Sequence, residues 1–227
     1  MSPVRPRLLD LCCCQGGASA GYTAAGFDVT GVDINPQPRY PYRFIQADAI
    51  DYLRELIRTR EILTYDVLAG SPPCQLHTKA WKIRKNDHPD LIAPMRRLFI
   101  ASGLPYVIEN VPGAPLQNPI ELCGAMFGLH TYRHRLFESN MPLTAPQHDY
   151  RDGPVVKMGR PLRDGNWYHA VGNFSNVPYV RRDLGLAWMN RDGLRESIPP
   201  AYAQHIGAQA LHYLATLNRS QNTPQAA

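Results

Sequence analysis

The sequence predicts an α/β fold in which a mostly parallel sheet carries helices on both faces. Short apolar runs of strand length alternate with helix-like segments through the first 138 residues, the pattern of repeated βαβ units. These runs end in polar or glycine-containing turns, where open sheets of this kind place their ligands. With 44% hydrophobic residues in a chain of 227, one compact domain can bury a sizeable core.

The expected elements follow one another without a long linker. An apolar run at 7–13 leads through a Gln-Gly-Gly turn into a small-residue helix at 18–25. Charges on the outer face of 51–60, and a glycine directly after 90–102, predict two more helices. Further strands are expected at 27–34, 43–48, 65–69 and 106–111.

The composition and periodicity of the sequence change beyond residue 138. Residues 140–182 are rich in Pro, Gly, Asn, Tyr and Arg and show little periodicity, which predicts a small irregular region. Helical character returns from residue 190, most clearly at 202–217, before a polar tail. These changes divide the chain into three parts, 1–139, 140–186 and 187–227.

Charge and cysteine usage favour a cytoplasmic protein with a polyanionic partner. The net charge is +5 and the pI is about 9.0, a mild preference for such a partner. The five cysteines are odd in number and lack a C-x-x-C pair, so neither a disulfide framework nor a metal site is expected. The N-terminus lacks the apolar core of a signal peptide, and no apolar run is long enough to cross a membrane.

The first two predicted strands end in residues that suit a nucleoside. Gly16 and Gly17 allow close approach of the backbone to a ligand, and the next helix begins there. Asp33 ends the second strand, where a carboxylate can accept from ribose hydroxyls, and Asp48 ends the third. The G-x-G-x-x-G and G-K-[ST] phosphate motifs are missing, which favours S-adenosylmethionine. The same residues would also suit a tight turn with two capping aspartates.

A cysteine follows the predicted strand at 65–69. The stretch Gly70-Ser71-Pro72-Pro73-Cys74-Gln75 places Cys74 at a strand end, after two prolines that stiffen the backbone and before a basic loop. This is a plausible setting for a nucleophilic thiolate. A single loop cysteine is, however, more often a small buried filler.

Taken together, the motifs resemble those of the DNA (cytosine-5) methyltransferases. The motifs occur in the family's order as Asp10-Leu11-Cys12-Cys13-Cys14-Gln15-Gly16-Gly17, Asp33, Asp48, Pro73-Cys74-Gln75, Glu109-Asn110-Val111 and Arg133-His134-Arg135. The match covers 7–138, with a fainter echo at 188–215. It implies a Rossmann-like class I S-adenosylmethionine-dependent methyltransferase fold. It also implies a catalytic and cofactor-binding domain at 1–139, a target recognition region at 140–186 and a C-terminal helical segment returning to the catalytic domain at 187–227.

The resemblance implies a set of residues that bind S-adenosylmethionine. They are Asp10, Cys12, Cys13, Gln15, Gly16, Gly17, Asp33, Ile34, Asp48, Ala49, Pro73, Ala208 and Gln209. The chain departs from the family at Cys12, where Phe is usual, at Cys14, where Gly is usual, and at Ala208, where Asn is usual. These departures suggest a remodelled methionine end of the site and leave open a modified S-adenosylmethionine.

The resemblance also implies four catalytic residues, Cys74, Glu109, Arg133 and Arg135. Carbon 5 of cytosine becomes a competent nucleophile once a thiolate adds to carbon 6, the role implied for Cys74. A carboxyl held by burial can protonate N3, the role implied for Glu109. Arg133 and Arg135 alternate with His134 on an expected strand and would point together toward O2. A surface ladder that pairs with carboxylates is the alternative for the two arginines.

Double-stranded DNA is the partner implied, with the cytosine flipped out of the helix. Basic and polar residues after Cys74, and arginines of the recognition region, are expected to contact it. They are Gln75, Lys79, Lys82, Arg84, Lys85, Arg160, Arg163, Arg181 and Arg182. The recognition region is short for the family, which predicts a short target site or weak selectivity. A monomer from a phage or mobile element, serving restriction-modification, fits this compact size.

Two other functions stay open at this point. One is a relative that modifies carbon 5 of a pyrimidine in tRNA, or that attaches a different group. The other is a catalytically silent DNA-binding relative, against which the presence of both Cys74 and Glu109 argues.

Overall fold

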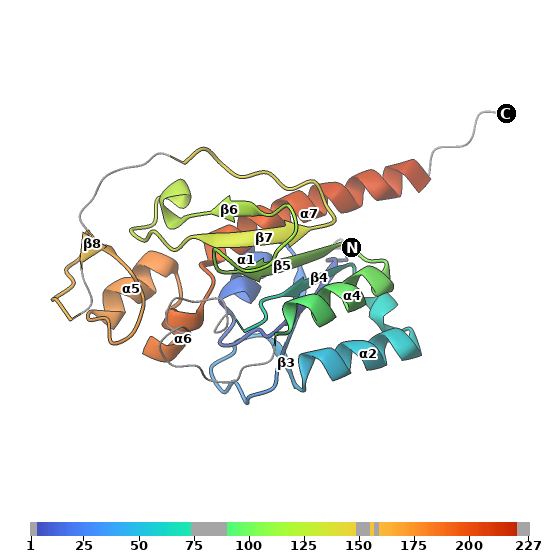
Figure 1. Cartoon of the computed structure of the whole chain (residues 1–227), viewed down its shortest axis with the longest axis horizontal. Helices are drawn as coiled ribbons and strands as arrows, with labels where there is room; N and C mark the ends of the chain where they lie inside the picture. Colours follow the sequence, from blue (N-terminus) through green and yellow to red (C-terminus); the bar gives the residue numbers. More distant parts are fainter. Residues whose placement is uncertain (1–3, 74–89, 149–154, 157–158, 222–227) are drawn as a thin grey trace.

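The computed structural model describes residues 4–73, 90–148, 155–156 and 159–221. Its centre is a seven-stranded sheet of order β3-β2-β1-β4-β5-β7-β6 (Figure 1). The strands are β1 (Arg7–Leu11), β2 (Asp28–Asp33), β3 (Arg43–Gln46), β4 (Val67–Gly70), β5 (Tyr106–Asn110), β6 (Ile120–Leu122) and β7 (Arg135–Ser139). The first five run parallel, β7 runs antiparallel to β5, and β6 pairs antiparallel with β7 at the edge of the sheet. The predicted, mostly parallel sheet is therefore confirmed.

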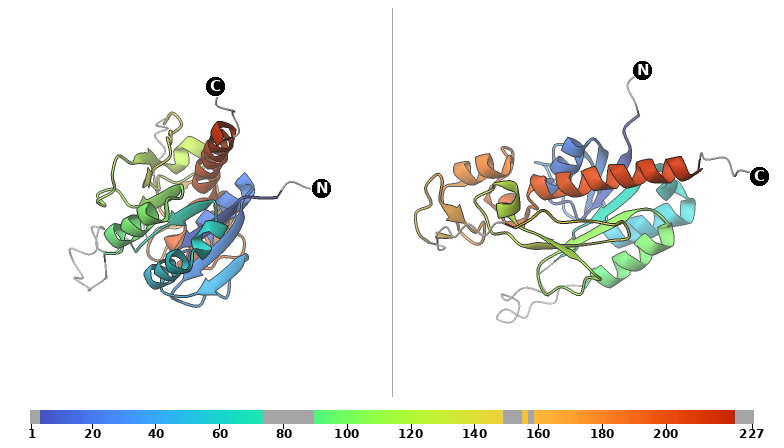
Figure 2. Two further views of the ribbon diagram at one scale, coloured as in Figure 1. Left: turned by 90° about the vertical axis from the view of Figure 1, so that its right-hand side faces the viewer. Right: turned by 90° about the horizontal axis from the view of Figure 1, so that it is seen from above.

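Helices cover both faces of the sheet (Figures 1 and 2). Those beside the sheet are α1 (Gly17–Ala25), α2 (Ala49–Thr59), α4 (Ile92–Ser102) and α7 (Pro200–Gln221). Successive strand residues face opposite sides, so Leu8 packs in the core with α1 and α7, whereas Leu9 packs in the core with α2 and α4. The strand order reverses between β1 and β4. Such a switch point is where open α/β sheets bind ligands.

The remaining elements are short. They are the 3₁₀ helices η1 (Glu61–Thr64) and η3 (Gly124–Phe127), the strands β8 (Val155–Val156) and β9 (Trp167–Tyr168), and the helices α5 (Val177–Leu184) and α6 (Arg191–Glu196). Leu162, Phe174 and Leu184 belong to a third cluster of buried residues that α5 helps to form. The part expected to be irregular thus contains a helix and its own small core. None of the helices that the structure describes has a stretch long and apolar enough to span a membrane.

Several predicted strand boundaries differ from the structure by one or two residues, as two examples show. The strand expected to reach residue 13 ends at Leu11, because Cys12 and Cys14 adopt left-handed backbone conformations with φ of 59° and 46°. The strand expected to hold Arg133, His134 and Arg135 begins only at Arg135. The two preceding residues make no ladder pairs within the described residues, since β5 and β6 pair with β7 at positions 135–139.

Candidate active site

A cavity of about 760 Å³ opens at the carboxyl ends of β1, β2, β4 and β5. Its wall includes nine of the predicted cofactor residues, namely Asp10, Cys12, Cys13, Gly17, Asp33, Ile34, Asp48, Ala49 and Pro73. It also includes three of the four predicted catalytic residues, Glu109, Arg133 and Arg135. Two groups of residues predicted from separate motifs therefore share one cavity. Its volume lies within the range typical of small-molecule sites.

The turn after β1 brings the C-terminal part of the chain against the cavity. Gly16 adopts a left-handed conformation with φ of 87°, and α1 starts at Gly17. A Cβ atom on Gly17 would lie 2.5 Å from the carbonyl oxygen of Ile198 and 2.9 Å from Cβ of Ser197. Only glycine therefore allows the segment between α6 and α7 to approach the turn so closely.

Two aspartates are held in fixed orientations at the rim. Asp33, 6% exposed, accepts hydrogen bonds from the backbone N–H of Cys14 at 3.0 Å and of Asn35 at 2.9 Å. Asp48 caps α2, where its Oδ1 accepts from the N–H of Ile50 and of Asp51, both at 2.9 Å. Within the described residues, Oδ2 of Asp48 accepts no hydrogen bond. Both carboxylates retain lone pairs toward the cavity.

Asp10 lies deep in the site and behaves differently. Its side chain is 1% exposed and accepts a hydrogen bond of 2.5 Å from the hydroxyl of Ser19, which in turn accepts from Tyr40. Burial raises the pKa of Asp10 from its ordinary value of 3.8 to about 7. Near neutral pH this carboxyl is therefore divided between its neutral and charged forms.

The three adjacent cysteines all line the cavity as thiols. Burial raises the pKa of Cys12, Cys13 and Cys14, and the negative charge of Asp33 acts in the same direction. None of the three resembles an activated nucleophile, which needs a lowered pKa. They serve as small, neutral wall residues, and Cys14 was not predicted as one.

Glu109 and two arginines form the other side of the cavity. Glu109 is 7% exposed, and Nε of Arg135 lies 2.9 Å from its Oε1. Burial raises the pKa of Glu109, even though Arg135, Arg133 and a hydrogen bond from Ser71 all act to lower it. The carboxyl is thus desolvated beside two positive charges, so its protonation can respond to a ligand. Both arginines line the same cavity, despite the late start of β7.

A hydrogen bond fixes the segment that leads to Cys74. Nδ2 of Asn110, at the end of β5, donates to the carbonyl oxygen of Pro72 at 3.0 Å. Oδ1 of Asn110 accepts from the backbone N–H of Val111 at 2.9 Å. Pro73 is the last described residue before the cysteine, and it lines the cavity. Cys74 lies outside the described residues, as do Gln75, Lys79, Lys82, Arg84 and Lys85.

Four predicted cofactor residues do not line the cavity. Gln15 donates from Nε2 to Oδ1 of Asn190 at 2.9 Å and thereby ties the first turn to the start of α6, while Gly16 packs on Tyr40. Ala208 and Gln209 lie on α7, outside the cavity wall.

The rotation of α7 about its axis explains why Ala208 and Gln209 do not line the cavity. Ile206, Gly207 and Ala210 face the core beside α1, which turns the residues between them away from it. Gln209 instead accepts from the backbone N–H of Thr144 at 2.8 Å, on the other side of the helix.

Sequence reasoning missed the segment between α6 and α7. Arg195, Glu196, Ser197 and Ile198 line the cavity, and Nη2 of Arg133 donates to the carbonyl oxygen of Arg195 at 2.6 Å. The adjacent Pro199-Pro200 pair marks a stiff turn, but nothing local indicates which site it reaches. This segment is recruited by the packing of α7, a long-range effect.

The predicted DNA-contacting arginines differ in their surroundings. Arg160 and Arg163 are exposed, and Arg182 forms an exposed ion pair of 2.6 Å with Asp164. Arg181 does not suit the predicted role, because its Nε donates to the carbonyl oxygen of Met189 at 2.6 Å and the side chain is half-buried.

No family model matches the chain. A curated relative, the putative ribosomal RNA large subunit methyltransferase of Methanocaldococcus jannaschii, is 30% identical over 87 residues, which cover 32% of this chain and 22% of the relative. The chain therefore aligns with about a fifth of the length of that protein.

Two solved structures share the fold over nearly their whole length. They are the Dnmt2 methyltransferase of S. pombe (TM-score 0.57, 13% identity) and the methyltransferase EhMeth of Entamoeba histolytica (TM-score 0.54, 10% identity). Each alignment covers 93% of this chain and 99% of the other. A DNMT2 mutant of Spodoptera frugiperda aligns less well (TM-score 0.43, 18% identity), over 65% of this chain and 56% of that one. The chain has a Rossmann-like class I S-adenosylmethionine-dependent methyltransferase fold.

Proposed function

We propose that this chain transfers a methyl group from S-adenosylmethionine to carbon 5 of a flipped-out cytosine in double-stranded DNA. One observation supports this most strongly: Asp33 and Asp48 share a single cavity with Glu109, Arg133 and Arg135. A nucleoside-type site and a desolvated acid flanked by arginines thus meet where a methyl donor and an acceptor ring would meet.

The residues at the first two turns fit S-adenosylmethionine. When bound, this cofactor supplies an activated methyl group on a sulfonium sulfur. Asp33 can accept from the ribose hydroxyls, and Oδ2 of Asp48 can accept from the adenine amine. The absence of a Cβ on Gly17 lets Ser197 and Ile198 close the wall. These residues offer acceptors for hydroxyl and amine groups, and the sequence lacks the phosphate-binding glycine motifs.

Cys74 is the proposed nucleophile, by the resemblance and by its place directly after Pro73. Its thiolate adds to carbon 6 of cytosine while N3 gains a proton from Glu109, which leaves carbon 5 nucleophilic. After methylation, a base removes the proton on carbon 5, the bond between carbon 6 and sulfur breaks, and the proton on N3 returns to Glu109. The electron pair returns to Cys74, so the thiolate is regenerated. The bond between Asn110 and Pro72 would aim the segment that carries the cysteine.

Glu109 has the environment that this proton transfer needs. Its raised pKa brings the protonated form closer to neutral pH than an ordinary glutamate allows. Arg135 faces the same carboxyl at 2.9 Å and balances its charge once the proton has left. Arg135 and Arg133, which is 9% exposed, are the two candidate donors to O2 of the ring.

RNA is the second candidate substrate. The curated relative named above is described as a putative ribosomal RNA methyltransferase, which makes a ribosomal RNA cytosine or uracil a specific alternative. Arg160, Arg163 and Arg182 are exposed and would serve either nucleic acid through phosphate contacts. A catalytically silent relative remains disfavoured, because Cys74 and Glu109 are both present.

The test uses the full chain and tritiated S-adenosylmethionine with matched DNA and RNA. We expect label in DNA from the wild type, none with Cys74→Ala, and normal labelling with Asp28→Asn, an exposed control outside the cavity. Label in RNA alone would replace the DNA proposal with the RNA alternative. Label that persists in Cys74→Ala would refute the nucleophile. A denaturant-stable adduct with 5-fluorocytosine DNA would report the nucleophile, the ring position and the substrate together.

A further inference from the structure

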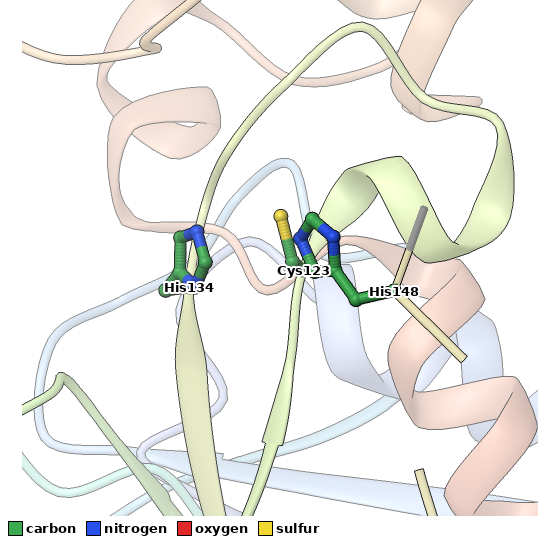
Figure 3. A group of neighbouring side chains, drawn as sticks. All are labelled: Cys123, His134 and His148. Carbon is green, nitrogen blue, oxygen red and sulfur yellow. The ribbon is translucent and has the colours of Figure 1, made fainter. Parts of the chain in front are cut away.

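Three potential metal ligands from distant positions meet beside β6 and β7. Cys123, His134 and His148 each offer one ligand atom, and these atoms all lie within 4.8 Å of one another (Figure 3). Cys123 is fully buried and the two histidines are half-buried. The spacing of 10 and 13 intervening residues matches none of the compact zinc motifs, so the sequence did not predict a metal site.

The register of the two strands explains how the cluster forms. In the antiparallel pair, Leu122 lies opposite Arg135, so Cys123 and His134 are the next facing positions along the chain. Facing residues of such a pair have Cβ atoms about 5 Å apart. His148 arrives from the segment after β7, and its ring stacks on that of His134 with centroids 5.8 Å apart and planes at 14°.

Neighbouring groups prepare two of the three side chains for a metal. The carboxylate of Glu121 lies against Nδ1 of His134, which places the proton on that nitrogen and leaves the lone pair of Nε2 available. Metal-bound histidines commonly have such a carboxylate on the second nitrogen. The backbone N–H groups of Gly124 and Ala125 donate toward the sulfur of Cys123. Those N–H groups would stabilise a thiolate once a cation is present.

We propose that Cys123, His134 and His148 bind one Zn²⁺ ion. One thiolate and two imidazoles are a ligand set that zinc prefers, at about 2.3 Å from sulfur and about 2.0–2.1 Å from nitrogen. Tetrahedral ligands at those distances lie roughly 3.5 Å apart, so no two of the three atoms, all within 4.8 Å of one another, need to approach by more than about 1.3 Å. The thiol loses its proton to solvent on binding, and water completes the fourth position. The ion would tie the end of β6, the start of β7 and the segment beyond β7 together.

The first experiment measures metal binding in the wild-type chain. Protein purified after expression in zinc-supplemented medium should contain one zinc per chain. After removal of metal with a chelator, cobalt chloride should give the intense visible absorption of tetrahedral Co²⁺ and a thiolate-to-cobalt charge-transfer band. Zinc chloride should abolish both signals by displacement and raise the Tm of the metal-free chain. No bound zinc, together with a cobalt spectrum that lacks the thiolate band, would overturn the proposal.

Variants test which side chains bind the ion. Cys123→Ser and His148→Gln should lose stoichiometric zinc, and Cys123→Ser should also lose the thiolate band. The matched controls Cys14→Ser and His212→Gln should keep one zinc. Zinc at wild-type levels in both ligand variants would refute the assignment.

A milder change covers the case in which a ligand variant does not fold. Glu121→Gln keeps all three ligands and removes only the carboxylate on His134, so zinc affinity should fall by about 10- to 100-fold. Unchanged affinity, measured against a competing chelator dye, would contradict the role of Glu121. None of these measurements uses methyl transfer, so their failure is distinct from failure of the proposed function.

Discussion

Asp10→Asn should remove a pH dependence from the stability of this protein. Burial raises the pKa of Asp10 from 3.8 to about 7, so between these values the folded chain holds a proton that the unfolded chain has released. Each pH unit in that interval costs about 1.36 kcal/mol of stability per group. From pH 5 to pH 7 the wild type should therefore lose about 2–3 kcal/mol through this carboxyl. The stability is present below pH 4 and is lost as the pH rises toward 7.

Urea unfolding at a series of pH values measures this effect. Glu109 also has a raised pKa and contributes a slope of the same sign, so only the difference between wild type and variant isolates Asp10. The asparagine keeps an oxygen that can accept from Ser19. We expect the free energy of unfolding of Asp10→Asn to rise relative to that of the wild type between pH 5 and pH 7. The exposed control Asp28→Asn should show the same pH dependence as the wild type. Parallel curves for wild type and Asp10→Asn would refute the assignment of a raised pKa.

Three further changes test the architecture around the cavity. Asn110→Ala removes the buried hydrogen bond to Pro72, so the free energy of unfolding in urea should fall by about 1 kcal/mol and 5-fluorocytosine DNA should be trapped more slowly. An unchanged trapping rate would contradict the positioning role of Asn110. Gly17→Ala places a Cβ 2.5 Å from a backbone oxygen, so the free energy of unfolding should fall by about 1–3 kcal/mol and calorimetry should show weaker S-adenosylmethionine binding. Wild-type affinity would show that the segment at Ile198 can move to accommodate the methyl group. In the wild type, Arg96 pairs with the buried Glu138 at 2.6 Å. Arg96→Leu leaves this carboxylate buried without its partner and should lower the free energy of unfolding in urea by about 3–5 kcal/mol. A loss below about 1 kcal/mol would mean that the pair is effectively solvated.

Local patterns were sufficient to predict the parallel strands, to within one or two residues, and the residues at their ends. Apolar runs of strand length locate β1, β2, β4 and β5, and parallel strands present their carboxyl ends at the same edge. Asp33, Glu109 and Pro73 therefore had to lie near one another once the strand order was set. These positions follow from where each strand ends, and short stretches of sequence are enough to indicate that.

Positions that depend on packing between distant elements could not be predicted in the same way. Gln209 belongs to a segment that resembles a cofactor motif, yet the face of α7 that is buried against α1 turns it toward Thr144. Arg195 reaches the cavity only because that packing brings the preceding segment across the first turn. The helical rotation and the direction of approach are set by contacts more than 150 residues apart in the chain, about which short motifs carry no information.

The tripeptide Arg133-His134-Arg135 links two sites because its successive side chains point in alternate directions. The two arginines line the cavity with Glu109, while the histidine between them points to the cluster with Cys123. A group that fixes His134 therefore fixes the backbone from which both arginines extend. The cavity needs this support, because Arg133 precedes β7 and makes no ladder pair within the described residues. The bond between its carbonyl oxygen and the hydroxyl of Tyr202, 2.7 Å long, supports it from α7. The proposed zinc would support it from β6, so the position of both arginines depends on parts of the fold that lie outside the cavity.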